Sequence, residues 1–397
     1  MIEKLKFIQA TRKKATTKTK RAEFDELHYG LDRHGDYCEL YVYEDGQYIV
    51  YRNNLVDQNK NTKNKVKRAD REFDFKFREL NGLSLRRAYG FVDKGLKRCI
   101  PKQFYFINEK YLNRLVKASS IDASSQYPSG CLGRLPTLDD DLYFDHYVEP
   151  TEEYPFAFYA SGHCAEYGVF DTHNWLDHKL AESLFRFNPR DDYPLRPLDK
   201  DHEHTILMKA SPYTMDSTWN YFYNLKNKCQ EGTEEYDLAK LVMNATIGCW
   251  HRKDKNKKRI MSYDDHGSYQ LAHIAAIAIA RGNQKILNML DEISPLLPLT
   301  NTLHICVDGI IYLGDKAYGI NEKKFGEFKQ EYTGADFMMT GTNTYCVRKD
   351  GHCIKFKHSS YDLLDGEPID ETKDFTFEDL YKLGRTERVG DYLWQEK

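Results

Sequence analysis

Hydrophobic and polar residues alternate along several short stretches, which is the pattern of half-buried β-strands. Residues 36–52 (DYCELYVYEDGQYIVYR) alternate about the turn-forming Glu44-Asp45-Gly46 and predict a hairpin. Strand character returns at 102–108, and residues 154–170 predict two strands joined at Ser161-Gly162.

A longer apolar stretch, residues 303–314 (LHICVDGIIYLG), predicts a tight hairpin with Asp308-Gly309 at its turn. Helical periodicity and capping signals predict further elements. We expect a helix over 216–228, a second that begins after Thr233 as N-cap, and a third from Ser268 to Ile293. The third has an alanine-rich face that would allow close approach to a sheet.

In the tail, Thr376 and Asp379 form a start like a capping box for one more helix. Strands and helices therefore mix along the chain without internal repeats, and the fold class expected is α+β. A chain of 397 residues is too long for one core, so two or three packed units are expected.

Composition places the chain among soluble globular proteins. Hydrophobic residues make up 41% and charged residues 30%, and mean hydropathy is −0.72. No apolar run has the length of a bilayer span, and the N-terminus does not read as a targeting segment. Nine cysteines stand singly, which favours reduced thiols. We therefore expect a cytoplasmic protein with no membrane partner.

Net charge is only −3, but basic residues cluster at 12–21, 60–68 and 251–259. Each cluster can bind a phosphate backbone or can be a solvated loop, and the sequence leaves both interpretations open.

Two aspartates carry the first sign of chemistry. Asp122 (in IDASSQYPSG) and Asp308 each lie beside an apolar, strand-like segment. Two carboxylates held side by side on a sheet supply the oxygen ligands that a pair of magnesium ions requires. The alternative is that a strand aspartate and a common Asp-Gly turn are unrelated.

The predicted second helix adds a positive charge. In DLAKLVMNATIGCW, Lys240, Asn244 and Gly248 recur every four residues and so share one helical face. A lysine there can neutralise a triphosphate, and a glycine leaves room for a base pair. Alone, this face could equally be an exposed lysine and a C-cap glycine.

Taken in order, the three stretches resemble the polymerase motifs of family B DNA polymerases, and most closely the protein-primed branch of small linear-genome phages. The first pattern, D-x-x-S-L-Y-P-S, matches at Asp122, Ser125, Tyr127, Pro128 and Ser129, and the second, K-x-x-x-N-S-x-Y-G, matches at Lys240, Asn244 and Gly248, while Gln126 and Ala245 differ from the two patterns. The third, Y-x-D-T-D-S, matches only at Asp308.

The resemblance implies a right-hand polymerase with an antiparallel palm sheet, helical fingers and a small thumb. The corresponding domains begin with a small N-terminal domain at 1–100 and the first part of the palm, with a branch-specific insertion, at 101–205. Fingers with a basic loop follow at 206–267, the second part of the palm at 268–345, and a thumb at 346–397.

The resemblance also assigns roles. Asp122, Asp308 and the main chain of Ala123 would hold two Mg²⁺ ions, with Mn²⁺ as a substitute. Tyr127 would exclude ribonucleotides, and Tyr345 would steady the primer terminus. The residues expected around the nucleotide are Ser124, Ser125, Gln126, Tyr127, Lys240, Asn244, Gly248 and Lys228.

Several positions depart from the family pattern. The first aspartate of the third motif is Cys306, the serine after Asp308 is Gly309, the second-motif tyrosine is Ile247, and the lysine of the later K-x-Y element is Asn343. Ile247 can still pack on a nascent base pair. These departures bear on fidelity and rate more than on the type of reaction.

The resemblance predicts no 3′–5′ exonuclease, because only 121 residues precede Asp122. One D-x-E match, Asp70 and Glu72, follows a basic run rather than an apolar strand, and we expect it to be a charged surface segment.

The function expected is template-directed DNA synthesis from dNTPs in viral or mobile-element replication. Primer-template DNA and a priming (terminal) protein are the expected partners. Two alternatives remain: a catalytically weakened relative that serves as a DNA-binding or regulatory replication factor, and a metal-dependent nuclease.

Overall fold

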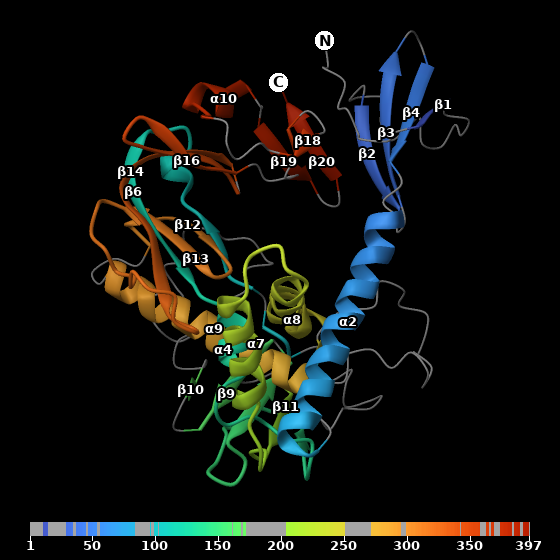
Figure 1. Cartoon of the computed structure of the whole chain (residues 1–397), viewed down its shortest axis with the longest axis vertical. Coiled ribbons are helices and arrows are strands. Elements are labelled where there is room, and N and C mark those ends of the chain that lie inside the picture. The colour runs from blue at the N-terminus through green and yellow to red at the C-terminus, as the bar shows by residue number, and fades with distance from the viewer. Residues whose placement is uncertain are drawn as a thin grey trace. The chain divides into compact units, whose positions relative to one another are not determined.

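The computed structural model (Figure 1) describes the side chains of Leu96 and of residues 68–83, 99–101, 103–160, 162, 164–167, 204–250, 271–294, 299–341, 343–357 and 374–380, and the backbone of the further elements given below. The chain divides into two compact units. Unit 1 comprises Met1–Lys63, Glu109–Ala118 and Gly334–Lys397, and unit 2 comprises Asn64–Asn108 and Ser119–Thr333. Every predicted site residue except Tyr345 belongs to unit 2. No helix in the described part is long and apolar enough to cross a membrane.

The first sheet of unit 2 contains the predicted hairpin. Its strands run in the order β14-β6-β13-β12-β5. Their bounds are Phe328–Gly341, Val116–Ala123, Gly309–Leu313, Thr302–Cys306 and Tyr105–Ile107, and β14 and β6 also extend into unit 1. Cys306 pairs with Gly309 in the antiparallel hairpin, so its two turn residues are Val307 and Asp308. The predicted hairpin is confirmed, with its turn one residue earlier than expected.

A second sheet in unit 2 is antiparallel in every pair, with the order β10-β9-β8-β11-β7. Its strands are Phe170–Asp171, His163–Glu166, Phe156–Tyr159, Thr205–Met208 and Leu142–Phe144. The predicted pair of strands is confirmed. Gly162 between them has φ +88°, and a Cβ there would lie 3.1 Å from Ile100 O, so glycine suits the turn on two counts.

The predicted helices of unit 2 are present. They are α7 (Asp216–Lys228), α8 (Glu234–Trp250) and α9 (Ala272–Ile293). Thr233 caps α8 as predicted, because its Oγ1 accepts a hydrogen bond from the Tyr236 N–H at 3.3 Å. The start of the third predicted helix, before 271, lies outside the described residues.

The alanine-rich face of α9 approaches a sheet as predicted. Ala272, Ala276 and Ala280 pack with Phe156, Phe158 and Ile206 of the second sheet. The carboxyl-terminal half of α9 packs instead against the first sheet, where Ile286, Leu290 and Ile293 share a core with Ile121, Ile305 and Ile310. One helix therefore supports both sheets of the unit, and burial of these side chains is the main source of its stability.

The stretch around Asp70 differs from the expectation. Residues Val56–Asn81 form a long helix, α2 (Figure 1). Within unit 2, Phe73 and Phe77 are fully buried against Trp219 and Phe222 of α7, and the ring centroids of Phe73 and Trp219 are 4.4 Å apart. Asp70 is only 7% exposed and accepts a 2.8 Å hydrogen bond from Trp250 Nε1. The prediction of a charged surface segment is wrong at Asp70, because the helix turns this carboxylate inward to a buried donor.

Unit 1 contains a four-stranded sheet in the order β1-β4-β3-β2. Its strands are Thr11–Lys14, Gln47–Asn53, Tyr37–Glu44 and Tyr29–His34. Glu44 pairs with Gln47 at the end of the β3–β4 hairpin, which confirms the hairpin predicted about residues 44–46. The strands β15 (Thr344–Lys349) and β16 (His352–Lys357) continue the sheet of β14 and β6, in the order β16-β15-β14-β6.

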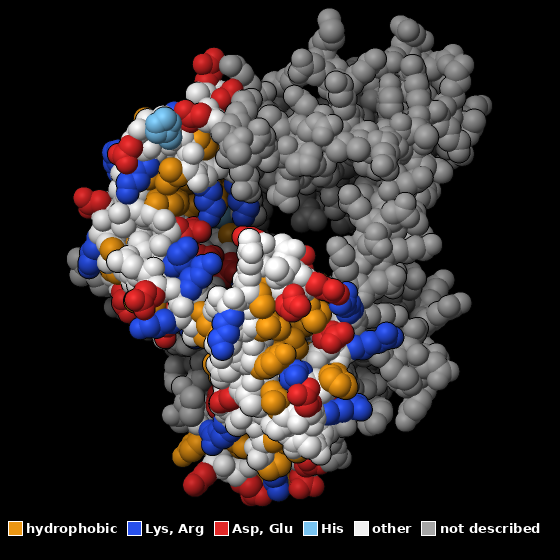
Figure 2. All heavy atoms as spheres, in the orientation of Figure 1, with side chains coloured by type: hydrophobic (Ala, Val, Ile, Leu, Met, Phe, Trp, Pro, Cys, Tyr) orange, Lys and Arg blue, Asp and Glu red, His pale blue; other side chains and the backbone are white. Residues whose placement is uncertain are grey.

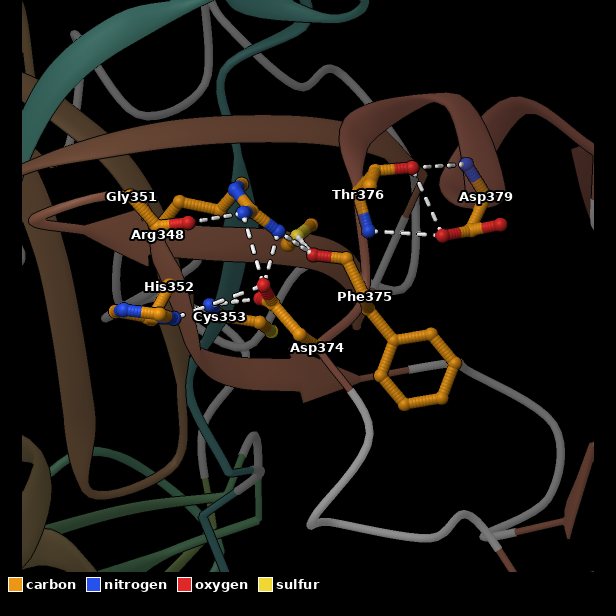
Figure 3. Close-up of polar contacts among 9 residues, drawn as sticks. Arg348, Gly351, His352, Cys353, Asp374, Phe375, Thr376 and Asp379 are labelled. Atoms are coloured by element: carbon orange, nitrogen blue, oxygen red, sulfur yellow. Dashed lines mark hydrogen bonds and ion pairs between the residues drawn. The ribbon is translucent and has the colours of Figure 1, made fainter.

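The tail of unit 1 is attached to the β15–β16 hairpin through Asp374 (Figure 3). Arg348 Nη1 donates to Asp374 Oδ1 at 3.0 Å, and the Cys353 N–H donates to the same oxygen at 2.7 Å. The Cys353 amide is the first cause of the lowered pKa of Asp374, with Arg348 adding to it. Arg348 also donates to the Phe375 and Gly351 carbonyl oxygens.

The predicted capping box follows directly. The Thr376 N–H donates to Asp379 Oδ2 at 2.8 Å, and the Asp379 N–H donates to Thr376 Oγ1 at 3.2 Å, at the start of α10 (Phe377–Lys382). The remaining elements of the unit are η1 (Glu109–Tyr111) and the strand pairs β17–β18 (Leu363–Leu364, Glu367–Pro368) and β19–β20 (Arg385–Val389, Tyr392–Glu396).

Candidate active site

The two predicted acids lie at adjoining strand ends. Asp122 is the last residue but one of β6, and the Ala123 N–H donates a 2.8 Å hydrogen bond to the main-chain oxygen of Asp308 at the hairpin tip. A Cβ at Gly309 would lie 3.4 Å from Asp122 Oδ1, so the carboxylate stands against the residue after Asp308. The structure thus brings together two residues that are 186 positions apart (308 − 122).

The chain turns sharply after Asp122. Ser125 adopts left-handed backbone angles (φ 57°, ψ 54°), and the short helix α4 (Gln126–Gly130) follows at once. The Gln126 side chain is buried at 2% exposure and points toward Gly282 of α9, where a Cβ would lie 2.7 Å from its Nε2. Only the main chain of Gln126 can therefore face a ligand in this conformation.

The turn is also held by the segment between β13 and β14, residues 314–327, which we call the connecting segment. The Gly326 N–H donates to Ser124 O at 2.8 Å, and the Ser124 N–H donates to Glu327 O at 3.0 Å. The amides of Ala123 and Ser124 are therefore engaged within the protein. The main chain after Ser124 remains the candidate for contacts with the phosphates of a nucleotide.

A half-buried lysine connects these parts. Lys285 of α9 donates from Nζ to Ser129 Oγ at 2.9 Å and to Gly326 O at 3.1 Å. Gly326 has φ +79°, and a Cβ there would lie 2.7 Å from Ser129 Cβ, so the contact requires glycine. Burial lowers the pKa of Lys285, and the charge of Glu327 opposes this effect.

α4 rests directly on α9. A Cβ at Gly130 would lie 2.5 Å from Ala278 O, a distance that admits no side chain. One turn on, Arg281 donates to Gly130 O and Leu132 O at 2.9 Å and to the buried Glu166 Oε2 at 2.6 Å. These contacts hold α4 against α9, and α4 directly follows the turn after Asp122.

Aromatic hydroxyls stand near Asp308. Burial raises the pKa of Tyr127, and the charge of Asp308 is the next cause. Tyr105 of β5 is similar, because burial raises its pKa and Cys306 and Asp308 add to the shift. Tyr127, the predicted sugar gate, therefore lies within electrostatic reach of the hairpin tip.

Two lysines of unit 2 and Asp122 lie within electrostatic reach of Lys226. The pKa of Lys226, on α7, is lowered first by burial and then by Lys323 and Lys240, while Asp122 raises it. Lys240 is the predicted lysine of α8. Lys323 lies on the connecting segment and was not predicted.

The sequence predicted Lys228 as the lysine of α7 near the nucleotide, and that contact stays a prediction. Lys228 is exposed and lies two residues after Lys226, which is about 200° around a helix. Since the two side chains point in nearly opposite directions, Lys226 is the α7 lysine that faces Asp122.

The second motif forms one exposed helical face, as its spacing predicted. Lys240, Asn244 and Gly248 are all exposed on α8. Lys240 Nζ lies 3.5 Å from Glu231 Oε1 and 5.4 Å from the centre of the Tyr236 ring. Ile247 is 2% exposed and belongs to the core shared by α7, α8 and α9. The prediction that Ile247 packs on a nascent base pair is wrong for this conformation, because the side chain faces inward.

Tyr345, the predicted primer-terminus residue, lies in unit 1. It is 4% exposed on β15, and its ring centroid is 5.5 Å from that of Phe337. Its contact with a primer stays a prediction.

The donor set at the strand ends suits a hard cation. Carboxylate and main-chain oxygens are what Mg²⁺ prefers, and Mg²⁺ commonly uses one or two protein carboxylates together with substrate phosphates. Within the described residues, no three His, Cys, Asp or Glu side chains converge on one point. Asp122 and Asp308 could thus hold magnesium only with further oxygens from main chain, nucleotide or water.

The fold is similar to that of a solved DNA polymerase. No protein-family model and no curated protein matches the chain. The chain is similar to phi29 DNA polymerase complexed with primer-template DNA and incoming nucleotide substrates, with a TM-score of 0.54 at 14% identity, over 81% of this chain and 64% of that one.

Two further structures of phi29 DNA polymerase agree. The binary complex with primer-template DNA gives a TM-score of 0.53 at 13% identity, over 80% of this chain and 63% of that one. The orthorhombic crystal form gives a TM-score of 0.53 at 13% identity, over 83% of this chain and 68% of that one. The chain thus spans a little under two thirds of the phi29 polymerase in the complexes, and the likeness establishes a polymerase-like fold of mixed helices and antiparallel sheets.

Proposed function

We propose that this protein is a DNA-directed DNA polymerase that extends a primer 3′-hydroxyl with deoxynucleotides and releases pyrophosphate. One observation carries the proposal. The hydrogen bond from Ala123 to Asp308 sets two carboxylates at adjoining strand ends, and Lys226, with Lys240 and Lys323 around it, lies within electrostatic reach of Asp122. A polymerase-like fold surrounds this arrangement.

Each group has a role in this reaction. Lys240 and Lys226 neutralise the triphosphate, which aligns the α-phosphate for in-line attack and stabilises the charge that develops on the leaving group. Main-chain amides after Ser124 bind phosphate oxygens, and Tyr127 packs beneath the sugar and excludes a 2′-hydroxyl. Asp122 and Asp308 would hold the divalent ions.

When bound, a pair of Mg²⁺ ions lowers the pKa of the attacking hydroxyl and neutralises charge on the transferred phosphate. Nothing in the donor set favours a soft metal except Cys306, which stands where the family has a further aspartate. One carboxylate fewer predicts weaker metal binding, and this residue is the reason to keep a second candidate.

The second candidate is a weakened polymerase relative that binds DNA as a replication factor. Cys306 and Asn343 motivate it, since both replace charged groups of the family pattern. The two candidates differ in one measurement, which is extension of a labelled primer-template by the purified protein with Mg²⁺ or Mn²⁺. Extension supports the first candidate, and DNA binding without extension under both metals supports the second. Strand shortening would support a nuclease instead.

The first prediction concerns Asp308. Asp308→Asn removes one of two carboxylates at the site, and we expect extension to fall ~10²–10³-fold, the loss typical of one such electrostatic group. DNA binding and the melting temperature should be unchanged. Asp315→Asn, an exposed acid on the connecting segment, is the matched control. Extension near the wild-type rate by Asp308→Asn would remove Asp308 from the site.

The mode of priming belongs to the same proposal. The sequence resemblance to the protein-primed branch motivates an assay for dNMP transfer onto the hydroxyl of a candidate priming protein. Extension of a DNA primer with no such transfer would leave a polymerase that starts from nucleic acid ends.

A further inference from the structure

The connecting segment is held in a defined position over the candidate site. Besides its bonds to Ser124, it is attached to α7, because Tyr223 Oη donates to Lys323 O at 3.1 Å. The Tyr223 ring stacks on Phe325, with centroids 4.6 Å apart and planes at 11°. The main chain of Lys323 is therefore fixed between α7 and the turn after Asp122, while its side chain is exposed.

Carboxylates offset the charges around Lys323 only in part, through the effect of Asp122 on Lys226. In the part of the chain that the structure describes, no carboxylate lies within ion-pair distance of Lys323 or Lys226, whereas Lys240 has Glu231 at 3.5 Å. Lys226 is partly buried, and the neighbouring lysines disfavour its charged form. Holding like charges together costs free energy, and an anion bound among them would recover it.

The charge is local. On the face drawn in Figure 2, blue and red side chains are interspersed, without an extended patch of one sign over the described part. Positive charge concentrated at Lys226, Lys240 and Lys323 suits one anion of high charge density. A compact polyphosphate has that density, and three ammonium groups from separate elements can surround it.

We propose that Lys323 and Lys226, together with Lys240, bind the polyphosphate tail of the incoming nucleotide, with Lys323 reaching it from the connecting segment. The inference rests on the proposed function and adds two residues that the sequence motifs do not contain. Because the same main chain holds both Lys323 and the Ser124 turn, the segment aligns the phosphates with the end of β6.

The test measures binding apart from catalysis. Binding of inorganic tripolyphosphate and of a dNTP to the full chain is followed by calorimetry at two salt concentrations. Lys323→Ala and Lys226→Ala should each weaken both ligands about tenfold, the loss expected for one contact to a charged group. Lys323→Arg should restore most of the affinity. Lys324→Ala removes the adjacent exposed lysine and is the matched control.

The outcomes separate the two proposals. Unchanged affinity in both alanine variants, or an equal loss in Lys324→Ala, overturns the role of Lys323 and leaves the polymerase proposal standing. Polyphosphate binding that depends on Lys323 in a protein that extends no primer overturns the polymerase proposal and keeps the anion site. Weakening of dNTP but not of tripolyphosphate would show that these lysines contact another part of the nucleotide, and would also overturn the inference.

Discussion

Asp308 owes its position to an unusual neighbour. Val307 precedes it in the two-residue turn with φ +61°, a conformation that a β-branched residue rarely adopts. Two hydrogen bonds hold the turn, from the Val307 N–H to Phe104 O at 2.9 Å and from the Asp308 N–H to Cys306 O at 2.7 Å. Strain of this kind persists where surrounding structure enforces it, and it is common at functional sites.

Tyr127 provides a prediction at the same scale. We expect Tyr127→Ala to relax sugar discrimination, because a smaller side chain leaves space for a 2′-hydroxyl. Tyr127→Phe should keep it, since the ring and not the hydroxyl excludes the ribose. The measurement is the ratio of kcat/KM for a dNTP over that for the matching rNTP, expected to fall at least ~10-fold in the alanine variant. An unchanged ratio would assign the gate elsewhere.

Single residues also show what sequence can and cannot predict. Asp122 and Asp308 are visible because each stands in a recognisable local pattern. Lys226 and Lys323 have no pattern of their own. Their proposed role follows from which side of α7 carries Lys226 and from how the connecting segment returns to Ser124, and both facts depend on contacts between residues distant in sequence.

At the scale of elements, helices with clear ends were predicted well. Helix α7 matches its predicted bounds, and α8 begins after Thr233 as its cap required. Helix α2 was missed because its lysines and asparagines obscured the signal. Ala69, Phe73 and Phe77 recur every four residues and are all buried, and that spacing could have identified its packed face.

The hydrogen bond between Trp250, at the end of α8, and Asp70 of α2 can be tested by mutation. Trp250→Phe removes the donor to Asp70 and leaves a buried carboxylate with one partner fewer. We expect the free energy of unfolding to fall by about 1.5–3 kcal/mol, as for hydrogen bonds to charged groups. Urea unfolding followed by far-UV circular dichroism measures this change. Arg71→Ala, on the exposed side of α2, should change it by less than ~0.5 kcal/mol. Equal values for both variants would contradict the prediction.

At the scale of the whole molecule, stability should depend on pH through His273. This side chain is fully enclosed near the start of α9, and burial lowers its pKa to about 3. The unfolded chain binds this proton near pH ~6.5, so the unfolded state takes up more protons between the two values. The stability contribution is therefore present above pH ~6.5 and is lost as pH falls, by up to about 1.4 kcal/mol per unit.

The measurement compares urea unfolding at pH 7.5 and 5.0, followed by tryptophan fluorescence, since Trp219 and Trp250 share a core with the start of α9. We expect wild type to lose ~2 kcal/mol more than His273→Gln over this range. His146→Gln changes an exposed histidine and should behave as wild type. Identical pH slopes for wild type and His273→Gln would show that this histidine does not titrate on unfolding.

The fold class was predictable because strand alternation and helix caps are local signals. The division into units was less so, because β6 and β14 each contribute to both, and no composition change marks such a crossing. The polymerase likeness rested on three short motifs in order, and the fold supports it at 13–14% identity, where overall sequence similarity carries no signal.

The contact between Gly130 and Ala278 limits how this site could be transplanted. Grafting the three short motifs onto another scaffold would transfer the acids and the lysine. It would not transfer the main chain of α9 at Ala278, against which α4 packs through Gly130. Without a glycine-to-alanine contact of that closeness, the two carboxylates would lose their spacing. A minimal graft therefore has to include α9, a helix that supplies no proposed reactive group.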